Sequence, residues 1–311
     1  MLSLAGIGWS VVAFIFLTYL IPHFVVTFLK PKDLKKAYNA KWGLVTGASS
    51  GIGKSLATRL ADQGLDVVLV ALQDGLLDAT FSELQAQFPK QTFRKVGVNL
   101  GRTGYLEKIA EATADIDVQV LFCNAGYMLT GFFENTPLEQ QMANLECNAV
   151  CAVAITHHFL AKMVAKKLKG CIVFTSSAAA AIASPFTALY AATKSFISSF
   201  GASLAVEVRH HGIDVLVFHP SPVNTRFYDK AHKLDVLDFF KAQAVHPDAL
   251  PDAVFRCIGR TVWADIGTTA LCFRLAMKLM DYNFMATITA LMAPVLPDFK
   301  KAMKSPAEQG G

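Results

Sequence analysis

Charged residues are scarce in this chain of 311 residues, where Asp, Glu, Lys and Arg together make up only 17%. The formal net charge is a modest +5, and the sequence contains no basic stripe with interleaved aromatic residues. We therefore do not expect a nucleic-acid partner, because proteins that bind nucleic acids concentrate Lys and Arg on one surface. The sequence also lacks internal repeats and low-complexity segments.

Paired cysteines are lacking as well, since no two of them form a CxxC motif or a metal-ligand spacing. Several lie inside apolar runs, where a free cysteine behaves as a small hydrophobic residue. We expect reduced, buried thiols, no metal site and a domain that faces the cytosol. The six are Cys123, Cys147, Cys151, Cys171, Cys257 and Cys272.

Hydrophobic residues make up 53% of the chain, which is more than in a usual soluble domain. The excess is concentrated in the first thirty positions and again from Thr268 to Val295. Ile7–Leu29 contains no charged side chain. With a rise of about 1.5 Å per residue, such a helix can cross a hydrocarbon core of about 30 Å. A cleaved signal peptide fits poorly, because the start MLSLAGIGWS has no basic region. We expect residues 1–29 to form a membrane anchor.

Residues 30–41 are expected to form a linker, and a cluster of four lysines at its start follows the anchor, while none precedes the anchor: Lys30, Lys32, Lys35 and Lys36. Positive residues flank membrane segments mainly on the cytoplasmic side, so the rest of the chain is expected in the cytosol. Pro22 leaves two forms of the anchor open. These are a kinked spanning helix and a hairpin that dips into one leaflet.

Residues 42–262 alternate short apolar runs with longer helical patterns, such as Ile52–Gln63 and Pro137–Lys167. This alternation is typical of a parallel sheet covered by helices on both faces. The expected fold class is therefore α/β, a single Rossmann-type doubly wound sheet. Its six expected strands are Gly43–Thr46, Asp66–Val70, Thr92–Val98, Val118–Phe122, Cys171–Thr175 and Ile213–Phe218.

The first expected strand runs into a glycine-rich turn, Thr46–Gly53, with the sequence TGASSGIG. Glycines allow a tight turn and a close approach of the backbone to a pyrophosphate, and the following helix N-terminus attracts that anion. A lone glycine-rich turn is a weak signal. Its position between a strand and a helix favours dinucleotide binding.

A second pattern, YAATK at Tyr190–Lys194, places a phenol and an ammonium on the same face of a helix. A nearby positive charge stabilises a phenolate, which suits proton transfer near neutral pH. Ser177 follows the expected strand Cys171–Thr175, at the strand end where open α/β sheets bind ligands. Taken singly, such a pair is commonly a helix-surface pair and such a serine a turn residue.

Together these patterns resemble the short-chain dehydrogenase/reductase family over roughly Trp42 to Arg226. The resemblance rests on TGASSGIG, on Asn124-Ala125-Gly126 after the fourth strand, and on the order of Ser177, Tyr190 and Lys194. It implies an oxidoreductase with a nicotinamide cofactor.

The same resemblance assigns catalytic roles. Tyr190 would be the general acid in ketone reduction, Ser177 would hold the substrate oxygen, and Lys194 would bind the nicotinamide ribose. Asn148 would hold a proton-relay water, with Asn144 as the competing candidate. The implied cofactor-binding residues are Gly47, Ser49, Ser50, Gly51, Ile52, Gly53, Leu72, Asn99, Asn124, Ala125, Gly126, Tyr190, Lys194, Pro220, Val223 and Thr225.

Three departures from the family pattern bear on the cofactor. The second strand ends without the acid that grips the ribose of NAD, because Ala71 and Leu72 stand there. This favours NADP(H), with NAD(H) as the alternative. Asn99 replaces an aspartate near the adenine, and Ser221 replaces a glycine after Pro220. His219, beside that segment, is interpreted as a strand-end residue rather than an acid–base group.

The order of anchor, basic linker and reductase domain resembles the very-long-chain 3-oxoacyl-CoA reductases and their 17β-hydroxysteroid dehydrogenase relatives. Tyr38–Gly53 and Leu160–Val173 carry this likeness. It implies a hydrophobic lipid or acyl-CoA substrate, contact with membrane lipids, location at the endoplasmic reticulum or a lipid droplet, and allows a homodimer. The alternatives are a steroid or retinoid dehydrogenase, and an idle family member that serves as a membrane complex subunit.

Residues 263–311 are expected to hold C-terminal helices. Leu271–Met280 is apolar, with Arg274 and Lys278 four residues apart on one face. It could lie in a membrane interface or cover the substrate as a lid. An apolar helix face packs more often on the protein itself, but this one adjoins a second apolar stretch, Phe284–Val295. We therefore give the two interpretations equal weight.

Overall fold

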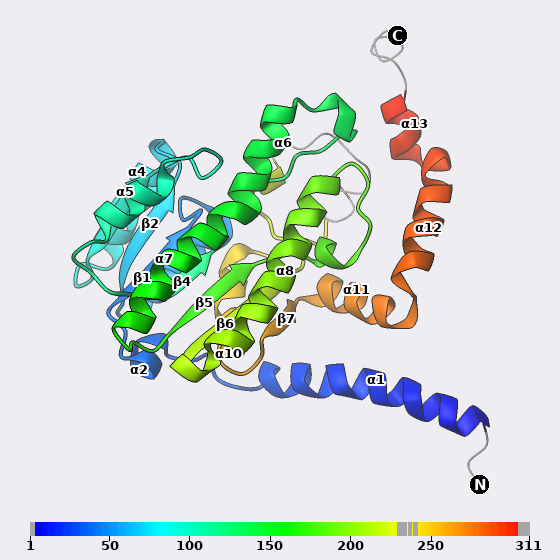
Figure 1. Ribbon diagram of the computed structural model, residues 1–311, viewed down its shortest axis with the longest axis horizontal. Helices are drawn as coiled ribbons and strands as arrows, with labels where there is room; N and C mark the ends of the chain where they lie inside the picture. Colours follow the sequence, from blue (N-terminus) through cyan, green and yellow to red (C-terminus); the bar gives the residue numbers. More distant parts are fainter. Residues whose placement is uncertain (1–3, 229–234, 236–237, 239–241, 304–311) are drawn as a thin grey trace.

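The computed structural model describes residues 4–228, 235, 238 and 242–303, and a single parallel sheet runs through its centre (Figure 1). All six expected strands are present, with bounds that differ by two residues at most from the expected ones. A seventh strand, which the sequence analysis missed, extends the sheet past residue 262. The strands are β1 (Trp42–Thr46), β2 (Asp66–Ala71), β3 (Phe93–Gly97), β4 (Val118–Cys123), β5 (Gly170–Thr175), β6 (Ile213–Pro220) and β7 (Trp263–Ile266).

The strand order β3-β2-β1-β4-β5-β6-β7 confirms the doubly wound α/β class. From β1 the chain builds outwards to β3, then crosses back to place β4 on the other side of β1. The carboxyl ends of β1 and β4 therefore lie at the point where the direction of winding reverses. Open α/β sheets bind ligands in the crevice at this point.

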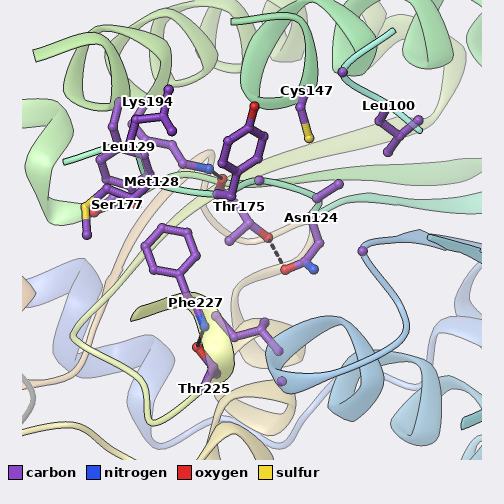
Figure 2. A pocket seen from close by; sticks show the side chains of 18 of the residues that line it. Leu100, Asn124, Met128, Leu129, Cys147, Thr175, Ser177, Lys194, Thr225 and Phe227 are labelled. Atoms are coloured by element: carbon purple, nitrogen blue, oxygen red, sulfur yellow. Dashed lines mark hydrogen bonds between the residues drawn. The ribbon is translucent and has the colours of Figure 1, made fainter. Parts of the chain in front are cut away.

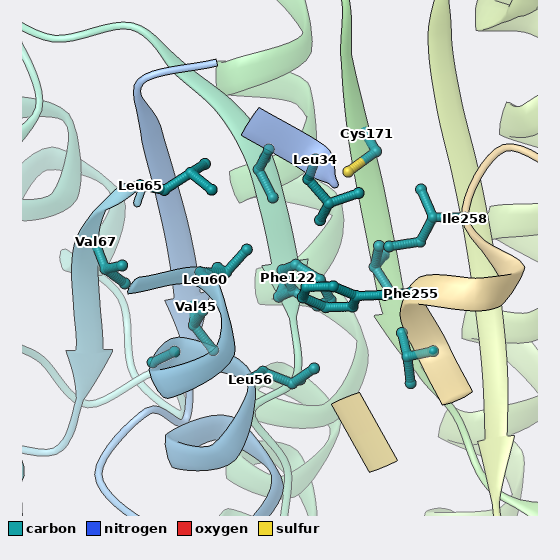
Figure 3. Packing of buried hydrophobic residues seen from close by; sticks show 14 of the residues in the cluster. Leu34, Val45, Leu56, Leu60, Leu65, Val67, Phe122, Cys171, Phe255 and Ile258 are labelled. Carbon is teal, nitrogen blue, oxygen red and sulfur yellow. The ribbon is translucent and has the colours of Figure 1, made fainter. Parts of the chain in front are cut away.

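Helices cover both faces of the sheet. One face carries α2 (Leu34–Tyr38), α3 (Gly51–Asp62), α4 (Gly75–Gln87) and α10 (Leu250–Cys257). On this face Phe122 of β4 stacks against Phe255 of α10 with ring centres 5.9 Å apart, beside Leu56 and Leu60 of α3 (Figure 3). All four side chains are fully buried, and each such residue contributes about 1.5–3 kcal/mol of hydrophobic stabilisation.

The opposite face carries α5 (Tyr105–Ala112), α6 (Leu138–Leu145), α7 (Cys151–Ala165) and α8 (Ala188–Val208). The helical pattern expected over Pro137–Lys167 is confirmed as a helix over Leu138–Ala165. A π-helical turn, Glu146–Val150, separates α6 from α7. Such turns widen a helix locally and occur often at functional sites. This one carries Asn148.

The segment expected as a basic linker, residues 30–41, packs on the domain. Leu34 and Tyr38 of α2 are buried. The Lys32 ammonium lies 3.1 Å from Asp214 Oδ2, and Lys35 donates to the backbone oxygen of Gly64 at 2.6 Å. These two lysines therefore have partners in the domain.

The N-terminal helix α1 (Leu4–Thr27) projects from the body of the molecule (Figure 1). Its residues Gly8–Thr27 are long and apolar enough to cross a membrane, with a mean hydropathy of 2.0 and only 6% of the stretch buried. The helical stretch Leu138–Ala165 is also long and apolar enough to cross a membrane, but it packs against the core of the domain. The C-terminal helices are α11 (Thr268–Leu279), α12 (Tyr282–Met292) and α13 (Pro297–Met303). Residues 1–3 of the expected anchor and 304–311 of the expected C-terminal region lie outside the described residues.

Candidate active site

A cavity of about 1570 Å³ opens at the carboxyl ends of the strands, between the loops that follow β1 to β6 (Figure 2). The sequence-predicted site residues converge on it from positions as distant as Gly47 and Thr225. All of them line the cavity except Gly53 and Asn148, which lie directly behind its wall. One site can thus hold both a dinucleotide and a substrate.

The glycine-rich turn is packed too tightly for side chains at two of its positions. Gly47 has φ +66°, and a Cβ there would lie 2.9 Å from the Cα of Ala125. A Cβ on Gly53 would collide with the carbonyl oxygen of Gly47. Among the described residues, Ser50 gives α3 no side-chain cap, and Ser50, Gly51 and Ile52 at the start of this helix line the cavity. This cradle fits a pyrophosphate.

Asn124 joins three strands beneath the cavity. Its Nδ2 donates to the Thr46 carbonyl of β1 at 3.1 Å, and its Oδ1 accepts from the Thr175 hydroxyl of β5 at 3.0 Å (Figure 2). The Thr46 hydroxyl accepts the backbone N–H groups of Asn124 and Ala125 at 2.9 and 3.0 Å. The sequence analysis left Thr46 out of the site, although it begins the TGASSGIG motif.

Lys194 lines the cavity and is only 3% exposed. Its ammonium donates to the Thr175 carbonyl at 2.8 Å, as Figure 2 shows, and lies 5.7 Å from the centre of the Tyr190 ring. Burial lowers the pKa of Lys194 from 10.5 to about 8, partly offset by Cys147 and Cys151. A cation is thus fixed beside the phenol that the motif predicts as the proton donor.

Ser177 follows β5 and caps the short 3₁₀ turn Ala178–Ala181. Its Oγ accepts from the backbone N–H of Ala179 at 3.2 Å. A hydroxyl has one donor as well as two acceptor sites, so this cap leaves its proton for a substrate oxygen. Ser177 is both a turn residue and a wall of the cavity.

Asn148 and its competitor Asn144 both hold the backbone of Tyr127. Asn148 accepts from Tyr127 N at 2.9 Å and donates to Tyr127 O at 2.8 Å, while Asn144 donates to the same oxygen at 2.8 Å. A Cβ on Gly126 would lie 3.2 Å from Asn148 Oδ1 and 3.4 Å from Lys194 Nζ. Asn148 therefore positions the loop after β4 and lies next to the Lys194 cation.

The end of the cavity beside β2 and β3, where the adenosine of a dinucleotide is expected, is lined by residues of both charges. Leu72 is 54% exposed and lines the cavity with Ala71, so neither charge stands at the end of β2. The charged lining residues Asp74 and Arg102, which follow β2 and β3, were missed by the sequence analysis. Asp74 caps α4, because its Oδ1 accepts from the backbone N–H groups of Leu76 and Leu77 at 3.1 and 3.0 Å. In the same region, Asn99 Oδ1 accepts from Gly101 N at 2.9 Å.

The serine that replaces the family glycine has a structural partner. Ser221 Oγ accepts from the backbone N–H of Ala270 at 3.0 Å, in the first turn of α11. Free N–H groups at a helix start need such acceptors. Further along, Val223 is buried and a Cβ on Gly51 would lie 2.8 Å from Thr225 Cγ2. The segment after β6 thus closes over the glycine-rich turn.

His219 lies under the site and is fully buried. Its Nε2 lies 2.9 Å from the hydroxyl of Ser198, which in turn donates to the Lys194 carbonyl at 2.7 Å. Burial lowers the pKa of His219 to about 4, so the ring is neutral at physiological pH. It does not line the cavity, which supports its interpretation as a strand-end residue. The Ser198 contact, through which it supports the catalytic helix, was missed.

One wall of the cavity is apolar. Met128 and Leu129 from the loop after β4 face Phe227, whose ring centre lies 5.6 Å from that of Tyr190. Phe273 and Thr269 of α11 complete this wall. The C-terminal helix α11 therefore contributes directly to the cavity wall.

A parallel α/β sheet with a glycine cradle and a Tyr–Lys pair at one cavity defines a nicotinamide-dependent oxidoreductase. Residues 41–234 match the short chain dehydrogenase family, and the chain belongs to it.

The chain is similar to several enzymes named very-long-chain 3-oxoacyl-CoA reductase. It is 31% identical to that of Laccaria bicolor over 76% of this chain and 69% of the relative. It is 32% identical to that of Meyerozyma guilliermondii over 78% and 72%, and 32% identical to the human protein over 60% of each chain.

Solved structures show the same fold. A 7β-hydroxysteroid dehydrogenase matches with a TM-score of 0.73 at 22% identity, over 83% of this chain and all of the other. A short-chain dehydrogenase from Sphingobium yanoikuyae, in complex with NADPH, matches with a TM-score of 0.67 at 25% identity, over 77% and 93%.

Proposed function

We propose that the protein reduces the ketone of a long-chain 3-oxoacyl-CoA with NADPH, as a step of fatty-acid elongation. The observation that carries this is the Tyr190–Lys194 pair at a cavity whose opposite wall is apolar. The similarity to very-long-chain 3-oxoacyl-CoA reductases supports the acyl-CoA class over other lipid ketones.

The residues present fit a bound nicotinamide dinucleotide. The backbone of Gly47–Gly53 would hold the pyrophosphate, and Lys194 would hold the ribose beside the nicotinamide. When bound, that cofactor supplies the hydride. Val223 and Thr225, which close over the glycine-rich turn, would meet the amide of the nicotinamide ring.

The chain itself supplies the proton and the positioning. Ser177 would donate a hydrogen bond to the substrate ketone oxygen and so hold it next to the Tyr190 hydroxyl. Tyr190 would then protonate that oxygen as negative charge develops on it, and the Lys194 cation would stabilise the phenolate left behind. Asn148, beside Lys194, would anchor the water through which Tyr190 regains its proton.

NADPH is proposed as the better cofactor, with a moderate preference over NADH. Ala71 and Leu72 place no acid where one would repel the extra phosphate, and Arg102 lines the same cavity with a positive charge. Asp74 opposes this preference, although its Oδ1 is already engaged in capping α4.

We place the enzyme at the endoplasmic reticulum or a lipid droplet, with its domain in the cytosol. The apolar helix α1 and the lysines that follow it support this location. Protease treatment of intact microsomes should digest the region after Lys41, and full protection of that region would contradict the topology.

The substrate is tested with the detergent-solubilised full chain, by following NADPH oxidation and identifying the products by mass spectrometry. Two panels are compared, 3-oxoacyl-CoA of increasing chain length and 17-keto steroids. We expect faster turnover of the long acyl chains. Preferred turnover of steroids would move the assignment to a steroid dehydrogenase. No turnover of either panel, with cofactor bound, would indicate an idle family member.

A further inference from the structure

The outer side of α12 exposes an apolar stripe. Phe284, Ile288 and Leu291 are 55%, 42% and 70% exposed and recur at the spacing of one helix face. The sequence carries no charged residue from Tyr282 to Pro297. A contiguous apolar surface of this kind marks an interaction site.

The second half of α1 is attached to the domain on one side. Its partly or fully buried residues recur at helical spacing: Phe16, Tyr19, Leu20, His23 and Val26. The Tyr19 hydroxyl donates to Asp265 Oδ2 at 2.9 Å, and the Lys278 ammonium of α11 lies 5.1 Å from the centre of the Tyr19 ring. The domain therefore contacts one side of this half of α1.

The first half of α1 has no such cover. Every residue from Gly8 to Ile15 is exposed, so the helix is bare around its whole circumference. In Figure 1 this half projects past the body of the molecule on the side where α12 lies. A partner protein with a groove covers one face of a helix, whereas lipid covers all of them. An uncharged helix that is bare on all sides fits hydrocarbon.

Lys278 sets the level of the membrane surface on α1. A charged ammonium is costly in hydrocarbon, and tyrosine prefers the membrane–water interface, so the Tyr19–Lys278 contact belongs among the headgroups. We propose that one bilayer leaflet is the partner of this surface. Residues upstream of Tyr19 insert into it, and the α12 stripe lies on it.

This docking places the cavity beside the membrane. Phe273 and Thr269 of α11 line the cavity, while Lys278 of the same helix meets α1. The helix α11 thus separates the substrate end from the leaflet. A lipid substrate enters along α11 from the leaflet, a consequence that rests on the proposed function.

Docking is tested with an environment-sensitive NBD label in the full chain, in a Cys272→Ser background because Cys272 is exposed. The label is placed at Ile288→Cys or at Leu291→Cys. The control label is placed at Glu111→Cys, an exposed position of α5. The chain is reconstituted into phosphatidylcholine vesicles that contain nitroxide-labelled lipid. We expect quenching at 288 and 291 and none at 111. Unquenched labels on vesicle-bound protein, or cross-links between the 288 positions of two copies, would overturn the proposal.

Substrate entry is tested with the Ile288→Glu/Leu291→Glu double variant. The control is Gln85→Glu/Gln87→Glu, which adds the same charge at two exposed positions of α4. For a vesicle-embedded long-chain 3-oxoacyl substrate, KM should rise about tenfold or more in the first variant only. KM for a water-soluble short-chain 3-oxoacyl-CoA should stay unchanged in both. Equal KM values for the embedded substrate would refute entry from the leaflet. Absence of all turnover would refute the proposed function and leave the quenching result standing.

Discussion

Tyr19 and Asp265 are 246 positions apart in the chain, yet the hydroxyl of one donates a 2.9 Å hydrogen bond to the carboxylate of the other. Asp265, only 4% exposed, also accepts from Nε and Nη2 of Arg274 at 3.0 and 3.3 Å. This carboxylate joins the apolar helix α1, strand β7 and helix α11. It therefore connects the membrane-docking surface to the wall of the active site.

Asp265→Asn should strongly destabilise the fold. It leaves the Arg274 guanidinium partly buried without its counter-charge, which costs about 3 kcal/mol of the free energy of unfolding. Tyr19→Phe removes one hydrogen bond and should cost about 1 kcal/mol. Thermal unfolding in detergent measures both. Glu83→Gln, which breaks the more exposed Lys54–Glu83 pair, is the control and should cost less than about 1 kcal/mol. Equal effects of the three changes would contradict the role of Asp265.

The lowered pKa of Lys194 predicts a pH dependence of cofactor binding. Because burial lowers this pKa to about 8, the ammonium loses its proton as the pH rises through that value. NADPH affinity should then fall, since the ribose loses a charged donor. Titration calorimetry from one pH unit below to one unit above this value measures the change. Lys194→Ala should bind weakly at every pH, and a pH dependence that persists in this variant would assign it to another group.

The same shift affects stability with the opposite sign. The unfolded chain keeps its lysine protonated up to about pH 10.4, while folded Lys194 releases its proton near pH 8. Between these values the unfolded state binds more protons. This one group therefore makes folding more favourable as the pH rises across the window, and penalises it below pH 8.

Ser221→Ala tests the link between the segment after β6 and α11. The variant removes the acceptor for the Ala270 N–H group, and losing a helix-start acceptor costs about 1 kcal/mol. The free energy of unfolding should fall by this amount, while Ser82→Ala on exposed α4 should leave it unchanged. A Ser221→Ala variant as stable as the parent would mean that the hydroxyl is dispensable.

Leu72→Arg tests the position of the adenosine end. A guanidinium at the end of β2 should strengthen NADPH binding by about fivefold through a charge-assisted contact with the extra phosphate. Binding of NADH should stay the same, and Leu72→Gln, which adds no charge, serves as the matched control. Isothermal titration calorimetry measures the affinities for both cofactors. Unchanged NADPH affinity in the arginine variant would place the phosphate elsewhere.

Local patterns predicted the sheet and most of the cavity. The runs of Val, Leu and Ile located six strands, and the glycine spacing located the turn at Gly47–Gly53, because both signals lie within short stretches. β7 was missed, since Trp263–Ile266 is only four residues long and contains the acid Asp265. The acid is buried only because Tyr19 and Arg274 reach it.

Long-range partners explain the remaining differences. The lysines after α1 have the pattern of a basic linker beside a membrane segment, and only the fold supplies Asp214 as the partner of Lys32. Likewise, the departure at Ser221 looks like a weakened cofactor motif until α11 is placed against it. The π-helical turn that carries Asn148 has no signal in the apolar pattern of its helix.

The proton-donor role of Tyr190 is the central claim, and turnover of the Tyr190→Phe variant tests it most directly. The change keeps the ring beside Phe227 and removes only the hydroxyl, so the variant should fold and bind NADPH as the parent does. Its rate of 3-oxoacyl-CoA reduction, followed as NADPH oxidation, should fall about a hundredfold or more. Ser177→Ala, measured alongside, should lower the rate with cofactor affinity nearly unchanged. Parental turnover by a folded, NADPH-bound Tyr190→Phe enzyme would contradict the account.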